Sequence, residues 1–147
     1  MSPNKQFKLN IQEIQSFIPH RYPFLLIDRV IEITPYESIL AMKNISISDP
    51  IFEGHFPNNP VYPGVMIIEG LAQASGVLGK YQCSDKINDV LLTEIGDARF
   101  RKKVIPGDNL YYKVVKEKQK GPFYWFAGTA TVDNEIVASV KFSAYMK

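Results

Sequence analysis

The chain has 147 residues, of which 46% are hydrophobic. It is therefore long enough to bury one core of its own, and we expect a single domain over residues 1–147. A net charge of +2 is too small to favour a nucleic-acid partner through bulk electrostatics, and a single cysteine, Cys83, excludes an internal disulfide.

The N-terminal residues contain no apolar run that could serve as a signal peptide, so we expect a cytoplasmic location. Asn10 and Glu13 have the spacing of a helix-capping box, and apolar residues recur at helical spacing up to Pro19. This pattern predicts a short amphipathic helix over residues 10–18 that covers the sheet as a lid. A turn follows at His20, to which we assign a structural role.

Two strands are predicted next, over residues 24–33 and 38–48, because both runs are rich in apolar and β-branched side chains. Pro35 separates them, and Asp49-Pro50 predicts the turn into a central loop.

The central loop, residues 54–64, is stiff, since five of its eleven residues are Gly or Pro. An apolar run follows Pro63, and proline is well tolerated in the first turn of a helix. We therefore predict a helix over residues 63–80. Its apolar residues lie on all sides, which indicates a helix buried by its surroundings, and it is too short and too rich in glycine to span a membrane.

Glu69 is the only charged residue between Phe56 and Gly79. Among its neighbours at helical spacing only Gln73 is polar, so an ionised carboxylate is costly there and Glu69 is a candidate proton donor. His55, which the loop fixes just ahead of the helix, is a candidate base. Each also has a structural interpretation: Glu69 as a solvated group or half of an ion pair, and His55 as a hydrogen-bonded loop residue.

The two side chains could face one small volume, within one subunit or across a symmetric contact. At the start of the helix, the N–H groups of Gly64 and Val65 carry partial positive charge that stabilises a developing oxyanion. A base, an acid and an oxyanion donor are the groups that elimination of water from a 3-hydroxy carbonyl compound requires.

The second half of the chain predicts a polar connection over residues 83–88 and then a strand over residues 90–103, with a bulge or break at Gly96-Asp97. Three more strands are predicted over residues 110–118, 123–132 and 135–146, the last two joined by a tight hairpin at Asp133-Asn134. Alternation in the last strand indicates a sheet with one buried face, so the pattern predicts an antiparallel sheet around one helix.

Four cations lie within five residues near the end of the strand at 90–103: Arg99, Arg101, Lys102 and Lys103. Such a run is either a solvated edge that discourages strand pairing or a docking patch for an acidic partner.

Three stretches resemble the FabZ-type (3R)-hydroxyacyl-[acyl-carrier-protein] dehydratases of bacterial fatty acid synthesis. They are Gly54 to Val65 followed by Glu69 to Gln73, His20 to Val30, and Ala98 to Val104 with Pro106 to Asp108. The resemblance covers nearly the whole chain. It implies an α+β hot-dog fold, in which a curled antiparallel sheet wraps around a long central helix.

The resemblance also implies a homodimer with two active sites at its interface, often assembled as a hexamer, a trimer of dimers. In each site the catalytic His55 comes from one subunit and Glu69 from the other. The implied partner is acyl carrier protein, with the basic run as its docking patch. The residues expected to bind substrate are Phe56, Pro57, Gly64 and Val65, together with Tyr62 and Phe100 as candidates for shaping an acyl tunnel.

No cofactor is implied beyond the phosphopantetheine arm that carries the substrate. With two histidines, one cysteine and no ligand-like spacing, we expect no metal site.

Three other functions remain open. A FabA-type dehydratase, which also isomerises the double bond, normally has Asp at the position of Glu69. A hot-dog thioesterase would use a carboxylate to activate water and would not require the His55 loop. A non-catalytic module that binds acyl chains or carrier protein would need neither residue. The assignment of acid and base between His55 and Glu69 is also open, because coupled groups titrate as a pair.

Overall fold

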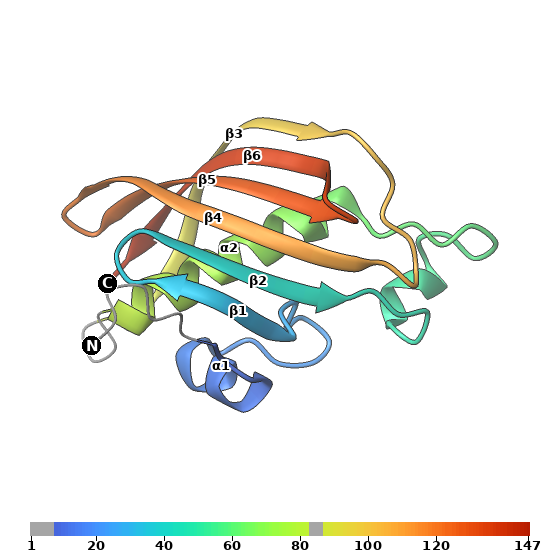
Figure 1. The fold of residues 1–147 in the computed structure, drawn as a ribbon, viewed down its shortest axis with the longest axis horizontal. Coiled ribbons are helices and arrows are strands. Elements are labelled where there is room, and N and C mark those ends of the chain that lie inside the picture. Colours follow the sequence, from blue (N-terminus) through green and yellow to red (C-terminus); the bar gives the residue numbers. More distant parts are fainter. Residues whose placement is uncertain (1–7, 83–86) are drawn as a thin grey trace.

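The computed structural model describes residues 8–82 and 87–147 (Figure 1). Its helices are α1 (Ile11–Phe17), a 3₁₀ helix η1 (Pro50–Glu53) and α2 (Gly64–Gln82). Its strands are β1 (Arg29–Thr34), β2 (Ser38–Asn44), β3 (Val90–Phe100), β4 (Asn109–Lys120), β5 (Phe123–Val132) and β6 (Glu135–Met146). Cys83 and most of the polar connection predicted after the long helix lie outside the described residues.

The six strands form one antiparallel sheet in the order β1-β2-β4-β5-β6-β3. The sheet curls around α2, which runs along its concave face, and α1 lies beside β1 (Figure 1). This arrangement confirms the hot-dog fold that the resemblance implies.

The core lies between α2 and the sheet, and α2 contacts β2, β4, β5 and β6. Its largest fully buried side chains include Leu71 and Leu78 of α2 and Tyr112 and Phe126 of the sheet. Burying such a side chain contributes about 1.5–3 kcal/mol, so the all-round apolar character of α2 is explained by the sheet that wraps it. Neither described α-helix combines the length and the apolarity that crossing a membrane requires.

Several local predictions are confirmed. Asn10 and Glu13 form a reciprocal capping box at the start of α1, and α2 begins one residue later and ends two residues later than predicted. The hairpin between β5 and β6 has positive φ at Asp133 and Asn134, as a two-residue turn requires. The pairing of β3 with β6 shifts register between Gly96 and Arg99, where the sequence indicates a bulge.

Three strand boundaries were predicted wrongly. Residues 24–28 are not part of β1, because the main chain at Phe24 and Leu26 bonds to the side chain of Gln73. Pairing with β2 begins at Asp28, whose N–H donates to Met42 O (2.8 Å) just ahead of β1. β2 ends at Asn44, opposite the first residue of β4, so it has no partner strand beyond that point. β3 ends at Phe100, and residues 101–103 follow it as an irregular segment.

Candidate active site

The loop that carries His55 is held at both of its ends. At its start, Asp49 caps η1 by accepting a hydrogen bond from Ile51 N (3.0 Å), and His55 N then donates to Ile51 O (3.1 Å). At its end, Val61 N donates to His55 O (3.1 Å) and Tyr62 N donates to the main chain beyond β3. The His55–Phe56 peptide bond is cis.

The His55 ring has a defined tautomer. Its Nδ1 lies 2.6 Å from Val61 O, and a carbonyl oxygen can only accept, so Nδ1 carries the hydrogen. In the neutral ring Nε2 therefore keeps its lone pair. The ring also stacks on Phe56 with 4.1 Å between centroids. The loop thus fixes the His55 ring through Nδ1 and leaves the lone pair of Nε2 available to accept a proton.

The N-terminus of α2 opens into a cavity of about 540 Å³. Because α2 begins at Gly64, the N–H groups of Gly64 and Val65 have no acceptor within the helix. The Phe100 ring packs against Gly64 so closely that an added Cβ would lie 2.7 Å from its Cε1 atom. Tyr62 also lines this cavity, and burial raises the pKa of its hydroxyl. The structure therefore brings Gly64, Val65, Tyr62 and Phe100 together.

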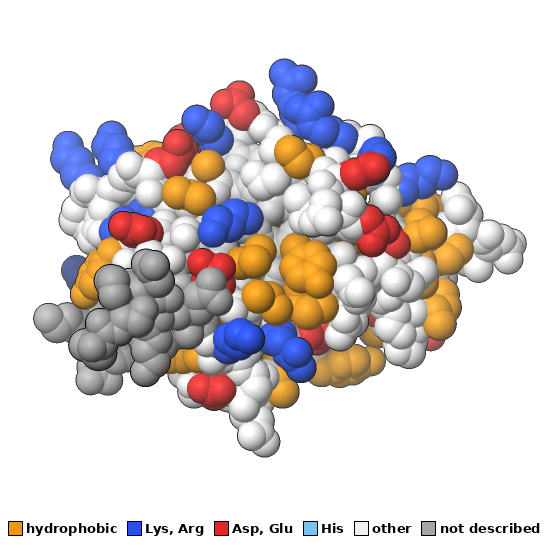
Figure 2. Space-filling view, viewed as in Figure 1, with side chains coloured by type: hydrophobic (Ala, Val, Ile, Leu, Met, Phe, Trp, Pro, Cys, Tyr) orange, Lys and Arg blue, Asp and Glu red, His pale blue; other side chains and the backbone are white. Residues whose placement is uncertain are grey.

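Of the basic run, residues 101–103 line the same cavity, while Arg99 belongs to β3. All four cations are exposed, and Lys102 is ion-paired with Glu135. Figure 2 shows Lys and Arg side chains along the edge of the molecule where β3 ends. Phe56 and Pro57 are exposed on the His55 loop and line neither this cavity nor the one beside Glu69.

Glu69 lies one and a half turns along α2 and faces a second cavity, of about 250 Å³. Its side chain is 24% exposed, so the carboxylate is not sealed in the core as the apolar sequence around it suggests. Gln73 Nε2 donates to Glu69 Oε1 (3.1 Å), which confirms the expected local partner.

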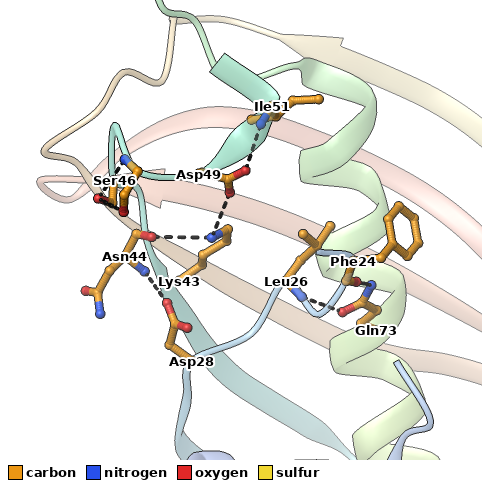
Figure 3. A network of polar contacts seen from close by, with 10 residues as sticks. Phe24, Leu26, Asp28, Lys43, Asn44, Ser46, Asp49, Ile51 and Gln73 are labelled. Carbon is orange, nitrogen blue, oxygen red and sulfur yellow. Dashed lines mark hydrogen bonds and ion pairs between the residues drawn. The ribbon is translucent and has the colours of Figure 1, made fainter. Parts of the chain in front are cut away.

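Gln73 also fixes the segment before β1. Its Oε1 accepts from Leu26 N (2.9 Å) and its Nε2 donates to Phe24 O (2.8 Å), as Figure 3 shows. Gln73 is 2% exposed. One buried amide thus ties the segment before β1 to the helix and to the Glu69 carboxylate.

His20, to which the sequence analysis assigns a structural role, lies beside Glu69 in the structure. Its Nε2 lies 3.7 Å from Glu69 Oε1, and it lines the same cavity. Its Nδ1 is buried, with no hydrogen-bond partner among the described residues. Burial lowers the pKa of His20, against an opposing effect of the Glu69 charge. Nothing in the spacing of residues 20 and 69 indicates this contact, because it depends on how the segment before β1 folds back onto α2.

Within one chain, His55 and Glu69 do not share a cavity. Glu69 lines the 250 Å³ cavity with His20, whereas His55 lines neither that cavity nor the one at the start of α2. Among the described residues no three His, Cys, Asp or Glu side chains are grouped as metal ligands would be.

Comparisons with known proteins agree on a family. The FabA-like domain family matches residues 18–141. A 3-hydroxyacyl-[acyl-carrier-protein] dehydratase FabZ from a Nitratiruptor species is 47% identical over 142 residues, covering 92% of this chain and 96% of that protein. A protein of the same name from Pseudoalteromonas translucida is 45% identical over 140 residues, covering 94% of this chain and 93% of that protein.

Among solved structures, the dehydratase heterocomplex ApeI:P from Xenorhabdus doucetiae has a TM-score of 0.79 and 19% identity, covering 91% of this chain and 90% of that chain. A hypothetical thioesterase with coenzyme A from Streptococcus pneumoniae has a TM-score of 0.63 and 12% identity, covering 80% of this chain and 84% of that chain. At these identities the likeness concerns the fold alone.

Proposed function

Because the chain belongs to the FabZ-type 3-hydroxyacyl-[acyl-carrier-protein] dehydratases of the FabA-like family, we propose that it converts (3R)-hydroxyacyl-carrier protein to the trans-2-enoyl product and water in fatty acid biosynthesis. The observation that carries the mechanism is the hydrogen bond from His55 Nδ1 to Val61 O, which leaves Nε2 as a base. Three chemical roles then have to be filled.

His55 Nε2 removes the proton from the carbon next to the thioester carbonyl. The electron pair of that C–H bond moves toward the carbonyl, and the N–H groups of Gly64 and Val65 at the start of α2 stabilise the enolate oxygen. Glu69 supplies a proton to the hydroxyl on the next carbon, so the C–O bond breaks, the double bond forms and water leaves.

The active site is assembled from two copies of the chain. In one copy Glu69 lines a cavity that His55 does not reach. β3 is an edge of the sheet, paired only with β6 in the order of strands. It carries exposed apolar side chains: Leu91, Leu92, Ile95 and Phe100. An edge strand with such side chains favours pairing with a second copy, which would bring Glu69 to the partner's His55 loop. The further assembly of three such dimers into a hexamer follows from the family resemblance.

Acyl carrier protein docks on the basic run. Arg101, Lys102 and Lys103 line the cavity at the start of α2, so an acidic carrier bound there delivers its phosphopantetheine arm toward the oxyanion donors. Glu135 partly neutralises the charge of Lys102, so we expect Arg101 and Lys103 to attract an acidic carrier more strongly than Lys102 does.

The acyl chain extends from the reacting carbons along α2. The cavity beside Glu69 is bordered by small side chains of that helix, Ala72, Ser75 and Gly76, and its lining reaches Lys80. Lys80 lies eleven positions after Glu69 on the helix, a rise of about 16 Å. Tyr62 and Phe100 shape the other cavity, at the entrance.

The test is mass spectrometry of purified protein incubated with 3-hydroxybutyryl-carrier protein. The proposal predicts loss of one water to a trans-2-enoyl product, abolished in His55→Ala and in Glu69→Gln, and unchanged in the matched surface variant Glu117→Gln. Free carrier protein would indicate a thioesterase. A FabA-type isomerase would move the double bond to carbons 3 and 4 of a longer 3-hydroxyacyl chain, a change that leaves the mass unaltered and that proton NMR detects. Unchanged substrate with retained binding would indicate a non-catalytic module.

A further inference from the structure

Lys43 is the one charged residue that is buried in the described part of the chain, at 8% exposure. It lies in β2, which otherwise alternates between apolar residues that face the core and half-buried ones. Removing an ammonium group from water is costly, and a buried ion pair is often no more stabilising than apolar residues of the same size. A buried lysine in this position therefore calls for a role other than stability.

The Lys43 ammonium group has three neighbours. Its Nζ lies 3.4 Å from Asp49 Oδ2 and 3.4 Å from Asn44 O, and 5.9 Å from the centre of the Tyr62 ring. Asn44 N in turn donates to Asp28 Oδ2 (2.7 Å). Figure 3 shows this network between β2 and the start of η1.

Two of these neighbours, Asp49 and Tyr62, bracket the segment that carries His55. Asp49 caps η1 through Ile51 N, and the carbonyl oxygen of the same Ile51 accepts a hydrogen bond from His55 N. Tyr62 directly follows Val61, whose carbonyl oxygen fixes the His55 ring. Lys43 thus contacts both ends of residues 49–62, while His55 lies between them.

We propose that Lys43 and Asp49 act as positioning residues that hold the His55 loop in its catalytic geometry. The inference rests on the proposed role of His55 as the base. Lys43 draws Asp49 and the Tyr62 ring toward one cation, which fixes the separation between the start of η1 and the start of α2. His55 Nε2 is then aimed by the loop, and a displacement of the loop moves the base relative to the substrate.

The experiment compares three variants with the wild type. Lys43→Met keeps an unbranched side chain that is one atom shorter and removes its charge. Asp49→Asn removes the charge but keeps an oxygen that can accept from Ile51 N. The double variant leaves no uncompensated buried charge, so its stability recovers. It still lacks the ion pair between Lys43 and Asp49 that holds the His55 loop. Lys141→Met is the matched control, since Lys141 is 61% exposed and pairs with Glu117 on the surface.

We expect Lys43→Met to lower kcat by about 10- to 100-fold with little change in KM, because small misplacements of a catalytic group have effects of that size. The double variant keeps the low kcat although its unfolding midpoint returns toward the wild-type value. Proton NMR should lose the downfield His55 Nδ1–H signal in Lys43→Met and retain it in Lys141→Met. A purely structural role would not move kcat or this signal in the folded protein.

The proposal is overturned if folded Lys43→Met retains wild-type kcat and the Nδ1–H signal while His55→Ala is inactive, which leaves the proposed function intact. If His55→Ala keeps full activity, the proposed function is wrong, and the NMR signal still reports whether Lys43 positions the ring.

Discussion

His20 and Glu69 meet at the cavity beside α2, with His20 Nε2 3.7 Å from Glu69 Oε1 and both side chains about one quarter exposed, at 26% and 24%. This contact puts an ionisable ring beside the carboxylate that we propose as the acid. Burial lowers the pKa of His20, so the ring is held neutral where an unfolded histidine would begin to take up a proton.

The first prediction concerns stability against pH. The folded state resists protonation of His20, whereas the unfolded chain titrates near the ordinary value of 6.5. The unfolded state therefore binds more protons as the pH falls through that value, and the free energy of unfolding decreases on the acid side. His20→Asn lacks this contribution, so urea denaturation between about pH 7.5 and pH 5 should show a flatter dependence than in the wild type. Parallel curves for the two proteins would contradict the assignment.

The second prediction concerns the approach of α2 to the sheet at Gly70. A Cβ at this position would collide with the ring and hydroxyl of Tyr112, which is fully buried. Gly70→Ala should therefore lower the free energy of unfolding by about 1–3 kcal/mol, as overpacking of a core does. Urea denaturation measures the change.

Gly76→Ala is the control for this substitution, because its added methyl group would have neighbours no closer than 3.6 Å. Here the better helix propensity of alanine should leave stability equal or raise it by up to about 1 kcal/mol. Equal losses at the two positions would show that the packing against Tyr112 is not the cause.

The third prediction concerns docking of the carrier protein. Arg101→Glu should raise KM for a carrier-linked substrate and weaken its dependence on salt, because it reverses a charge at the rim of the cavity. The same variant should leave kcat/KM unchanged for a small thioester that lacks the carrier. Lys141→Glu, on a different part of the surface, serves as the comparison. A similar change with both substrates would indicate that Arg101 acts on the reaction site rather than on docking.

The features that could be predicted from the sequence are those set by neighbouring residues. The Asn10–Glu13 capping box and the Asp133-Asn134 hairpin depend on two to four consecutive positions, and both are confirmed. Glu69 and Gln73 lie one helical turn apart, so their contact could be predicted in the same way. The interactions between neighbouring residues are enough to determine these three features, without contacts from distant parts of the chain.

The features that could not be predicted depend on contacts between distant residues. Residues 24–28 have strand-like side chains, but the main chain at Phe24 and Leu26 bonds to Gln73, which lies 47 positions after Leu26. The contact of His20 with Glu69 and the burial of Lys43 beside Asp49 arise in the same way, from segments that meet only in the folded chain. Alternation along β2 places Lys43 on its inward face, but it does not reveal the carboxylate that receives the ammonium group.

The central claim is that His55 of one copy acts with Glu69 of another, and mixing inactive variants tests it most directly. His55→Ala and Glu69→Gln are each expected to be inactive alone. When they are unfolded together and refolded as a mixture, half of the dimers should combine the two, and each of these has one intact site. We predict recovery of about one quarter of the wild-type activity. A mixture as inactive as its components would contradict a site shared between two copies.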